Sequence, residues 1–210
     1  MTPQRESPAW AAFGILGLLS YLFVATEPIP LPEQLLLAIA FLIGPLVMIG
    51  LVGFYRTLRE QDDSLTLHLA GVFSVVAFSF FCLMLVVQQS VRLFLRDYIA
   101  EAPDEPTRRT FRLIERGVDP VQLGIDVTFD IFISLSMICF ALVFSRRAGF
   151  GIAVGASGVV IALSLLLLNL ASFPRPPAEA GSIDLGPLAA LWWLLVFALY
   201  LWQAWKRSRA

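Results

Sequence analysis

The sequence predicts an all-α membrane protein, a polytopic bundle of six transmembrane helices with both termini in the cytoplasm. The first observation is composition: 58% of the 210 residues are hydrophobic and only 15% are charged, whereas about a quarter of a soluble domain is charged. The second is that six apolar segments are long enough to cross a bilayer core, which takes about 20 residues. The third is that basic residues gather in alternate connections. The net charge of −1 gives no field that would attract nucleic acid.

Each apolar segment should be a helix, because lipid offers no hydrogen-bond partner to an open backbone group. A proline or a capping residue marks most of the expected starts, as in Ser7-Pro8, Pro32-Glu33, Ser64, Asp119-Pro120 and Gly186-Pro187. We expect the first segment to remain in the protein, since no small-x-small cleavage site follows it. The six expected spans are about residues 8–25, 32–55, 66–95, 120–145, 149–171 and 186–205.

The distribution of lysine and arginine predicts the orientation of the bundle. The first connection has no basic residue and the fifth has only Arg175. The second connection, the fourth connection and the C-terminus hold more, namely Arg56, Arg59, Arg146, Arg147, Lys206, Arg207 and Arg209. Because short cytoplasmic loops are enriched in basic residues, we expect these three regions, and hence both termini, on the cytoplasmic side.

The third connection is the exception, because it places several arginines on the outer side. Its pattern predicts a short amphipathic outer helix at about 104–117, with Asp104 as its cap, Pro106 in its first turn and Gly117 at its end. This helix would lie on the membrane surface or across the mouth of the bundle, or it would be an ordinary solvated helix. We treat residues 1–210 as a single transmembrane domain.

Polar side chains from three of the expected helices fall in the outer half of the bundle when depth is counted at about 1.5 Å per residue. Asp126 and Asp130 share one face of the fourth helix, and Asn169 lies on the small-residue face of the fifth. Helical side chains lean toward the N-terminus of their helix, so an arginine on the third helix should reach these acids and form an ion pair. The candidate ligand-binding residues are therefore Gln88, Arg92, Asp126, Asp130 and Asn169.

Two hypotheses explain charged groups at this depth, where each costs about 2.5–3.5 kcal/mol on insertion scales. In the first, the cluster is a structural clasp that fixes helix packing. In the second, it is an outward-facing pocket through which the protein binds, senses or translocates a small solute, a lipid or an ion. The second predicts that Asp130→Asn spares folding and abolishes binding or transport.

A function of another class also fits the sequence: assembly or signalling through docking on the fifth helix. Gly151, Gly155 and Gly158 form a small-residue stripe that could admit a helix of a partner or of a second copy. Signals for an enzyme are weak, because the chain has one histidine, His68, and one lysine, Lys206. We expect no catalytic residue, metal or cofactor, and no disulfide between the two cysteines. The tryptophans of the sixth helix have the spacing of an interfacial belt.

One stretch of sequence resembles a known family. It is "LNLASFPRPPAEAGSIDLGPLAALW", residues 168–192, preceded by "FDIFIS", residues 129–134. Together they are similar to the C-terminal half of a family of uncharacterised bacterial six-helix membrane proteins with an FPxPPxxAGxxDxGP outer-loop motif. The resemblance covers residues 120–205 and implies a multi-pass protein of the bacterial inner (plasma) membrane. It implies special roles for Asp130, Asn169, Pro174 and Asp184, and no established activity.

Overall fold

The computed structural model describes residues 9–26, 29–146 and 151–209, and these residues form six α-helices and no strand. All six are long and apolar enough to cross a membrane, which confirms the predicted all-α membrane bundle. The predicted Ser7 cap and Arg147 lie outside the described residues. The helices are α1 Ala9–Thr26, α2 Glu33–Arg59, α3 Leu65–Ala100, α4 Glu105–Ser145, α5 Gly151–Ser172 and α6 Gly186–Arg209.

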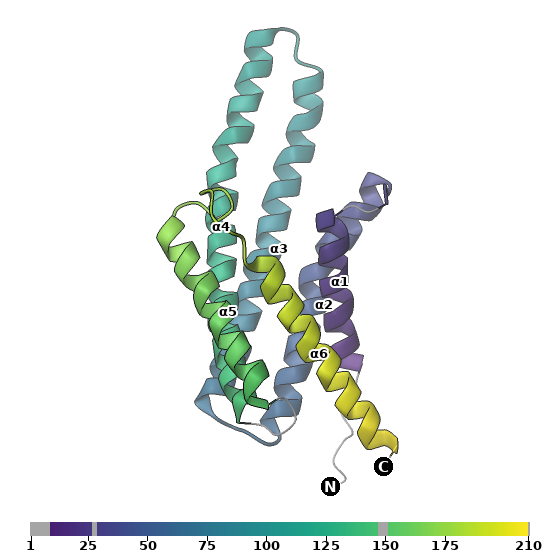
Figure 1. Cartoon of the computed structure of the whole chain (residues 1–210). Helices are drawn as coiled ribbons and strands as arrows, with labels where there is room; N and C mark the ends of the chain where they lie inside the picture. The colour runs from purple at the N-terminus through teal and green to yellow at the C-terminus, as the bar shows by residue number, and fades with distance from the viewer. Residues whose placement is uncertain (1–8, 27–28, 147–150, 210) are drawn as a thin grey trace.

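The helices close into a ring. Each packs against its neighbours in the sequence, and α6 also packs against α1 (Figure 1). The chain passes from α3 to α4 at one end of the bundle, here named the hairpin end, and the connections α1–α2 and α5–α6 lie on the same side. The C-terminal end of α6 lies at the opposite end, named the terminal end. A ring of this kind has a centre to which all six helices can contribute side chains.

Three of the predicted helix starts are confirmed. Ser64 caps α3, its hydroxyl accepting a hydrogen bond from the Leu67 backbone N–H at 3.3 Å. The start of α2 follows Pro32 directly. At α6 the Asp184 carboxylate accepts from the Gly186 backbone N–H at 2.8 Å, which satisfies one of the free donors at a helix start.

The prediction of a separate short helix at 104–117 was right about where the helix starts and wrong about where it ends. Asp104 does cap a helix, accepting from the Thr107 backbone N–H at 2.8 Å. That helix continues through Gly117 and Pro120 and becomes α4, 41 residues long. At about 1.5 Å per residue, α4 is about 60 Å long and α3 about 54 Å, roughly twice the bilayer core. The α3–α4 hairpin therefore extends well beyond the other helices (Figure 1).

The proline inside α4 is tolerated where the two arms of the hairpin pack together. Pro120 lacks the backbone N–H that would bond the carbonyl four residues before, and its side chain is exposed. Packing between the two arms of the hairpin offsets the loss. Tyr98 of α3 contacts Phe111 of α4 with ring centroids 5.6 Å apart, and the Arg108 side chain of α4 donates to the Ile99 carbonyl of α3 at 3.4 Å. Tertiary contacts thus override the local stop signals.

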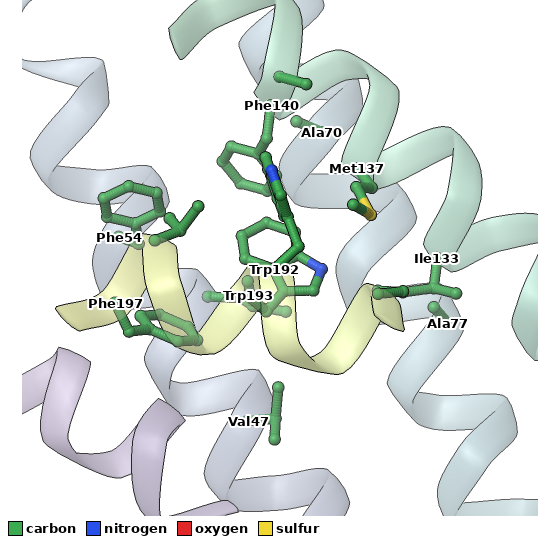
Figure 2. Close-up of a cluster of buried hydrophobic side chains, with 14 of the residues drawn as sticks. Val47, Phe54, Ala70, Ala77, Ile133, Met137, Phe140, Trp192, Trp193 and Phe197 are labelled. Carbon is green, nitrogen blue, oxygen red and sulfur yellow. The ribbon is translucent and has the colours of Figure 1, made fainter. Parts of the chain in front are cut away.

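The core fills the bundle toward the terminal end with aromatic rings. Phe54 of α2 lies 5.3 Å from Phe144 of α4, and Phe140 lies 5.3 Å from Trp193 of α6, measured between ring centroids. Figure 2 shows the α6 rings of Trp193 and Phe197 among these side chains. Trp192 and Trp193 are 4% and 2% exposed, so the expectation of an interfacial belt was wrong for this pair.

A pair of buried serines also joins the two long helices, α3 and α4, inside the core. Ser74 of α3 and Ser136 of α4 are both buried, and their hydroxyl oxygens lie 2.6 Å apart. One hydroxyl donates to the other, and the second donates to the Ala70 carbonyl, which lies 2.8 Å from the Ser74 oxygen and 3.0 Å from that of Ser136. These bonds fix the register of α3 against α4.

Candidate functional site

A cavity of about 230 Å³ lies at the centre of the ring. All six helices contribute to its wall, and the connection before α6 adds Asp184, whose side chain is exposed at the hairpin end. The deeper wall is apolar. The lining residues are Leu18, Tyr21, Ile43, Val47, Phe78, Phe81, Met84, Asp126, Phe129, Asp130, Ile133, Leu165, Asp184, Gly186, Ala189, Ala190 and Trp193.

Asp130 is the most buried acid of this cavity, with 8% of its surface exposed. Its carboxylate accepts a hydrogen bond from the Asn169 side-chain amide of α5 at 2.9 Å. The same amide donates to the Leu165 carbonyl one turn earlier, at 3.0 Å, and Asn169 is 0% exposed. The prediction that Asn169 faces protein and not lipid is therefore confirmed, and the bond joins α4 to α5.

Three carboxylates gather at the hairpin end of the cavity. Asp126 lies one helical turn from Asp130 on α4, and Asp184 approaches from the α5–α6 connection. Both Asp126 and Asp184 are close enough to Asp130 to repel its charge. None of the described lining residues is a lysine, arginine or histidine. The cavity thus combines an acidic mouth with an uncharged interior.

Three of the five predicted site residues do not line the cavity. One of them, Asn169, still bonds the lining residue Asp130. Neither Gln88 nor Arg92 lines the cavity, and Arg92 is exposed. The predicted ion pair from Arg92 to Asp126 or Asp130 is not among the ion pairs of the described residues. Arg96, one turn further along α3, faces away from the cavity as well: it binds both carboxylate oxygens of Glu33 on α2, each at 2.8 Å. This stripe of α3 faces α2 and the surface, because depth and side-chain lean do not determine which way a helix is rotated.

The sequence argument missed residues that come from the first and last helices. Tyr21 of α1 and Trp193 of α6 both line the cavity. Tyr21 lies within electrostatic range of Asp184, Asp126 and Asp130. A signal existed for Tyr21, since it carries one of the few polar groups of an otherwise apolar span. No signal distinguished Trp193 from the exposed tryptophans of α6.

Three buried polar atoms near this region have no hydrogen-bond partner among the described residues: the Ser134 hydroxyl, the Asn169 side-chain oxygen and the Trp193 indole N–H. An unpaired buried donor or acceptor costs about 1–3 kcal/mol. Of the three, only Trp193 belongs to a residue that lines the cavity. Its N–H is a donor that cavity contents could satisfy.

The described part of the chain contains no group of three or more histidine, cysteine, aspartate or glutamate residues that could hold a metal ion. Cys82 and Cys139 are both free thiols. The Phe173–Pro174 peptide bond, in the loop that the resemblance singled out, is cis.

Six membrane-length helices around a central acidic cavity define a multi-pass membrane protein with an internal polar site. Comparisons of the chain with protein-family models, with curated proteins and with solved structures find no match.

Proposed function

We propose that the protein binds a small solute in the central cavity, as a receptor or as one step of translocation across a bacterial inner membrane. The observation that supports this most strongly is the cavity itself, because all six helices line it and three carboxylates stand at its mouth. Intramembrane ionisable groups that face a bundle interior commonly mark a solute or ion path.

The distribution of basic residues supports an orientation in which the hairpin end faces outward. Arg56 and Arg59 end α2 at the terminal end, and Arg146 follows α4 there. Under the positive-inside rule the terminal end is cytoplasmic. The acidic mouth at Asp184 then opens to the outside, and the α3–α4 hairpin projects from the outer face.

The competing hypothesis of a structural clasp accounts for only part of this geometry. Asp130 and Asn169 do join α4 to α5. Asp184 instead bonds the start of its own helix. No hydrogen bond or ion pair of the described residues ties Asp126 to another helix. Asp184 thus has only a local capping role, and both Asp126 and Asp184 repel Asp130. A carboxylate without a structural partner at Asp126 is better explained by a ligand than by packing.

Docking through the glycines of α5 finds little support. A side chain at Gly155 would meet the Ala141 carbonyl at 2.7 Å, and one at Gly158 would collide with the Trp192 ring. Helices α4 and α6 of the same chain therefore occupy two of the three positions. Of these three glycines, Gly151 alone would place an added side-chain carbon more than 4 Å from every described residue beyond its own helical turn. A partner or a second copy would need another surface.

The proposal is tested by the thermal stability of the purified protein in a panel of small charged and neutral solutes. We expect at least one solute to raise the unfolding temperature of the natural protein and of Asp119→Asn, an exposed carboxylate on the same helix. The rise should disappear in Asp130→Asn and in Ala190→Phe, which fills the cavity, although both variants still fold. If Asp130→Asn fails to fold or melts far lower, the clasp hypothesis is correct instead.

A further inference from the structure

The charges of the cavity indicate the sign of its ligand. Asp126, Asp130 and Asp184 lie within range of mutual repulsion, and no basic side chain of the described residues lines the cavity with them. An anionic ligand would add to this repulsion, whereas a cation at the mouth would relieve it.

The wall indicates which kind of cation fits. Phe129 packs against Phe78 and Phe81 with ring centroids 5.6 and 5.3 Å apart, and all three rings line the cavity. A hard metal ion requires a shell of oxygen ligands, and the described residues form no such group. Aromatic rings that line the same cavity as the carboxylates instead suit an organic ammonium group, which is attracted to the ring quadrupole and needs no coordination shell.

Trp193 provides a second, independent observation. Its side chain is 2% exposed and lines the cavity, and its indole N–H has no acceptor among the described residues. A ligand with a hydroxyl or carbonyl oxygen would satisfy this donor. The volume, about 230 Å³, is below the range of about 300–1,000 Å³ typical of sites for drug-sized ligands, so the ligand is small.

We propose that the cavity binds a small organic cation, an amine or quaternary ammonium that also carries a hydrogen-bond acceptor. The ammonium group lies at Asp126, Asp130 and Asp184 beside the Phe129 ring, and the acceptor lies toward Trp193. This inference rests on the proposed function and specifies its ligand class. The ligand is a free solute and not the headgroup of a lipid, because the adjoining phosphate would face the same carboxylates.

The test compares choline with 3,3-dimethylbutan-1-ol, which has the same shape and hydroxyl but no charge. Binding to the full-length protein in detergent is measured by titration calorimetry. We expect choline to bind about tenfold or more tightly than the neutral alcohol, since charge–carboxylate and cation–π attraction act only on choline. Asp130→Asn should remove this preference and Asp119→Asn should keep it. Phosphocholine, which models the lipid headgroup, should not bind.

The possible results separate the two proposals. If choline and the alcohol bind equally and Ala190→Phe abolishes both, the cavity binds solutes but the cation inference is wrong. If phosphocholine binds as well as choline, the free-solute assignment is wrong and a lipid headgroup is the ligand. If neither choline nor the alcohol binds, the cation inference is overturned. In that case the thermal-stability panel of solutes still tests the proposed function, which is wrong if no solute stabilises the protein.

Discussion

The hydrogen bond between Asn169 and Asp130 gives a quantitative prediction for the bundle. The perturbation is a pair of near-isosteric changes, Asn169→Leu and Asp130→Leu, made singly and together. Both side chains are buried, and the amide nitrogen lies 2.9 Å from the carboxylate oxygen. Hydrogen bonds to charged groups contribute about 1.5–3 kcal/mol in soluble proteins, but measured side-chain couplings in a membrane bundle average about 0.6 and reach about 1.7 kcal/mol.

The short distance and the burial of both side chains, 0% exposed for Asn169 and 8% for Asp130, place this pair at the upper end of the membrane range, so we expect a coupling energy of about 1–1.7 kcal/mol. Asn169→Leu alone should destabilise by about 1–2 kcal/mol, because it leaves the carboxylate without its donor. The free energy of unfolding of all four proteins is measured reversibly in bicelles. Effects that add to within about 0.3–0.5 kcal/mol would mean that the two groups do not interact, and the site geometry would be wrong.

Three further predictions concern other parts of the chain. Gly158→Ala should lower the free energy of unfolding by about 1–3 kcal/mol through overpacking against α6, whereas Gly117→Ala, with open space around it, should raise it by up to about 1 kcal/mol. Arg92→Ala should leave solute affinity in calorimetry unchanged, because this exposed side chain does not line the cavity; a clear loss would refute the assigned wall. Hydrogen bonds from the Thr107 side chain and then its backbone N–H lower the pKa of Asp104. Its capping contribution is therefore present above about pH 4, the ordinary range of aspartate, and is lost as the pH falls through the lowered value. The unfolding temperature of the natural protein should fall toward that of Asp104→Asn on acidification, and a pH-independent difference between the two would contradict this.

Much of the fold follows from local rules that operate within one helix. Apolar length fixed the spans to within a few residues for α1, α2, α5 and α6. The Ser64 cap and the helix start after Pro32 depend on residues within one turn of the helix, so the sequence is enough to predict them. The stripe of small residues on α5 likewise identified the face on which Asn169 is buried, because close helix packing needs that face.

The wrong predictions concern helix ends and helix rotations that are determined by packing between helices. Gly117 and Pro120 are stop signals only for an isolated helix, and packing of α4 along α3, which includes the contact of Tyr98 with Phe111, outweighs them. The rotation of α3 about its axis leaves Arg92 at the surface and, one turn on, brings Arg96 to a bond with Glu33 of α2. Depth counting cannot detect that bond, since the two residues lie 63 positions apart.

The residues that line the cavity also divide into those that the sequence could identify and those that it could not. Asp126 and Asp130 were identifiable because an acid in an apolar span is rare and costly. The aromatic wall could not be identified, because a phenylalanine lining a cavity and one facing lipid look alike in a sequence. Residues from α1 and α6 meet those of α4 only once the ring closes.

The central claim is that the acidic cavity opens at the hairpin end of the bundle. The most direct test measures whether reagents outside the cell reach the cavity. Ala190 lines the cavity and is 9% exposed. In a background without Cys82 and Cys139, Ala190→Cys is treated in intact cells with membrane-impermeant methanethiosulfonates, one bearing trimethylammonium and the other sulfonate. The account predicts modification from outside, faster with the cation, while Ala100→Cys on the exposed hairpin reacts with both. Modification of the Ala100→Cys control alone would contradict an open, acidic cavity.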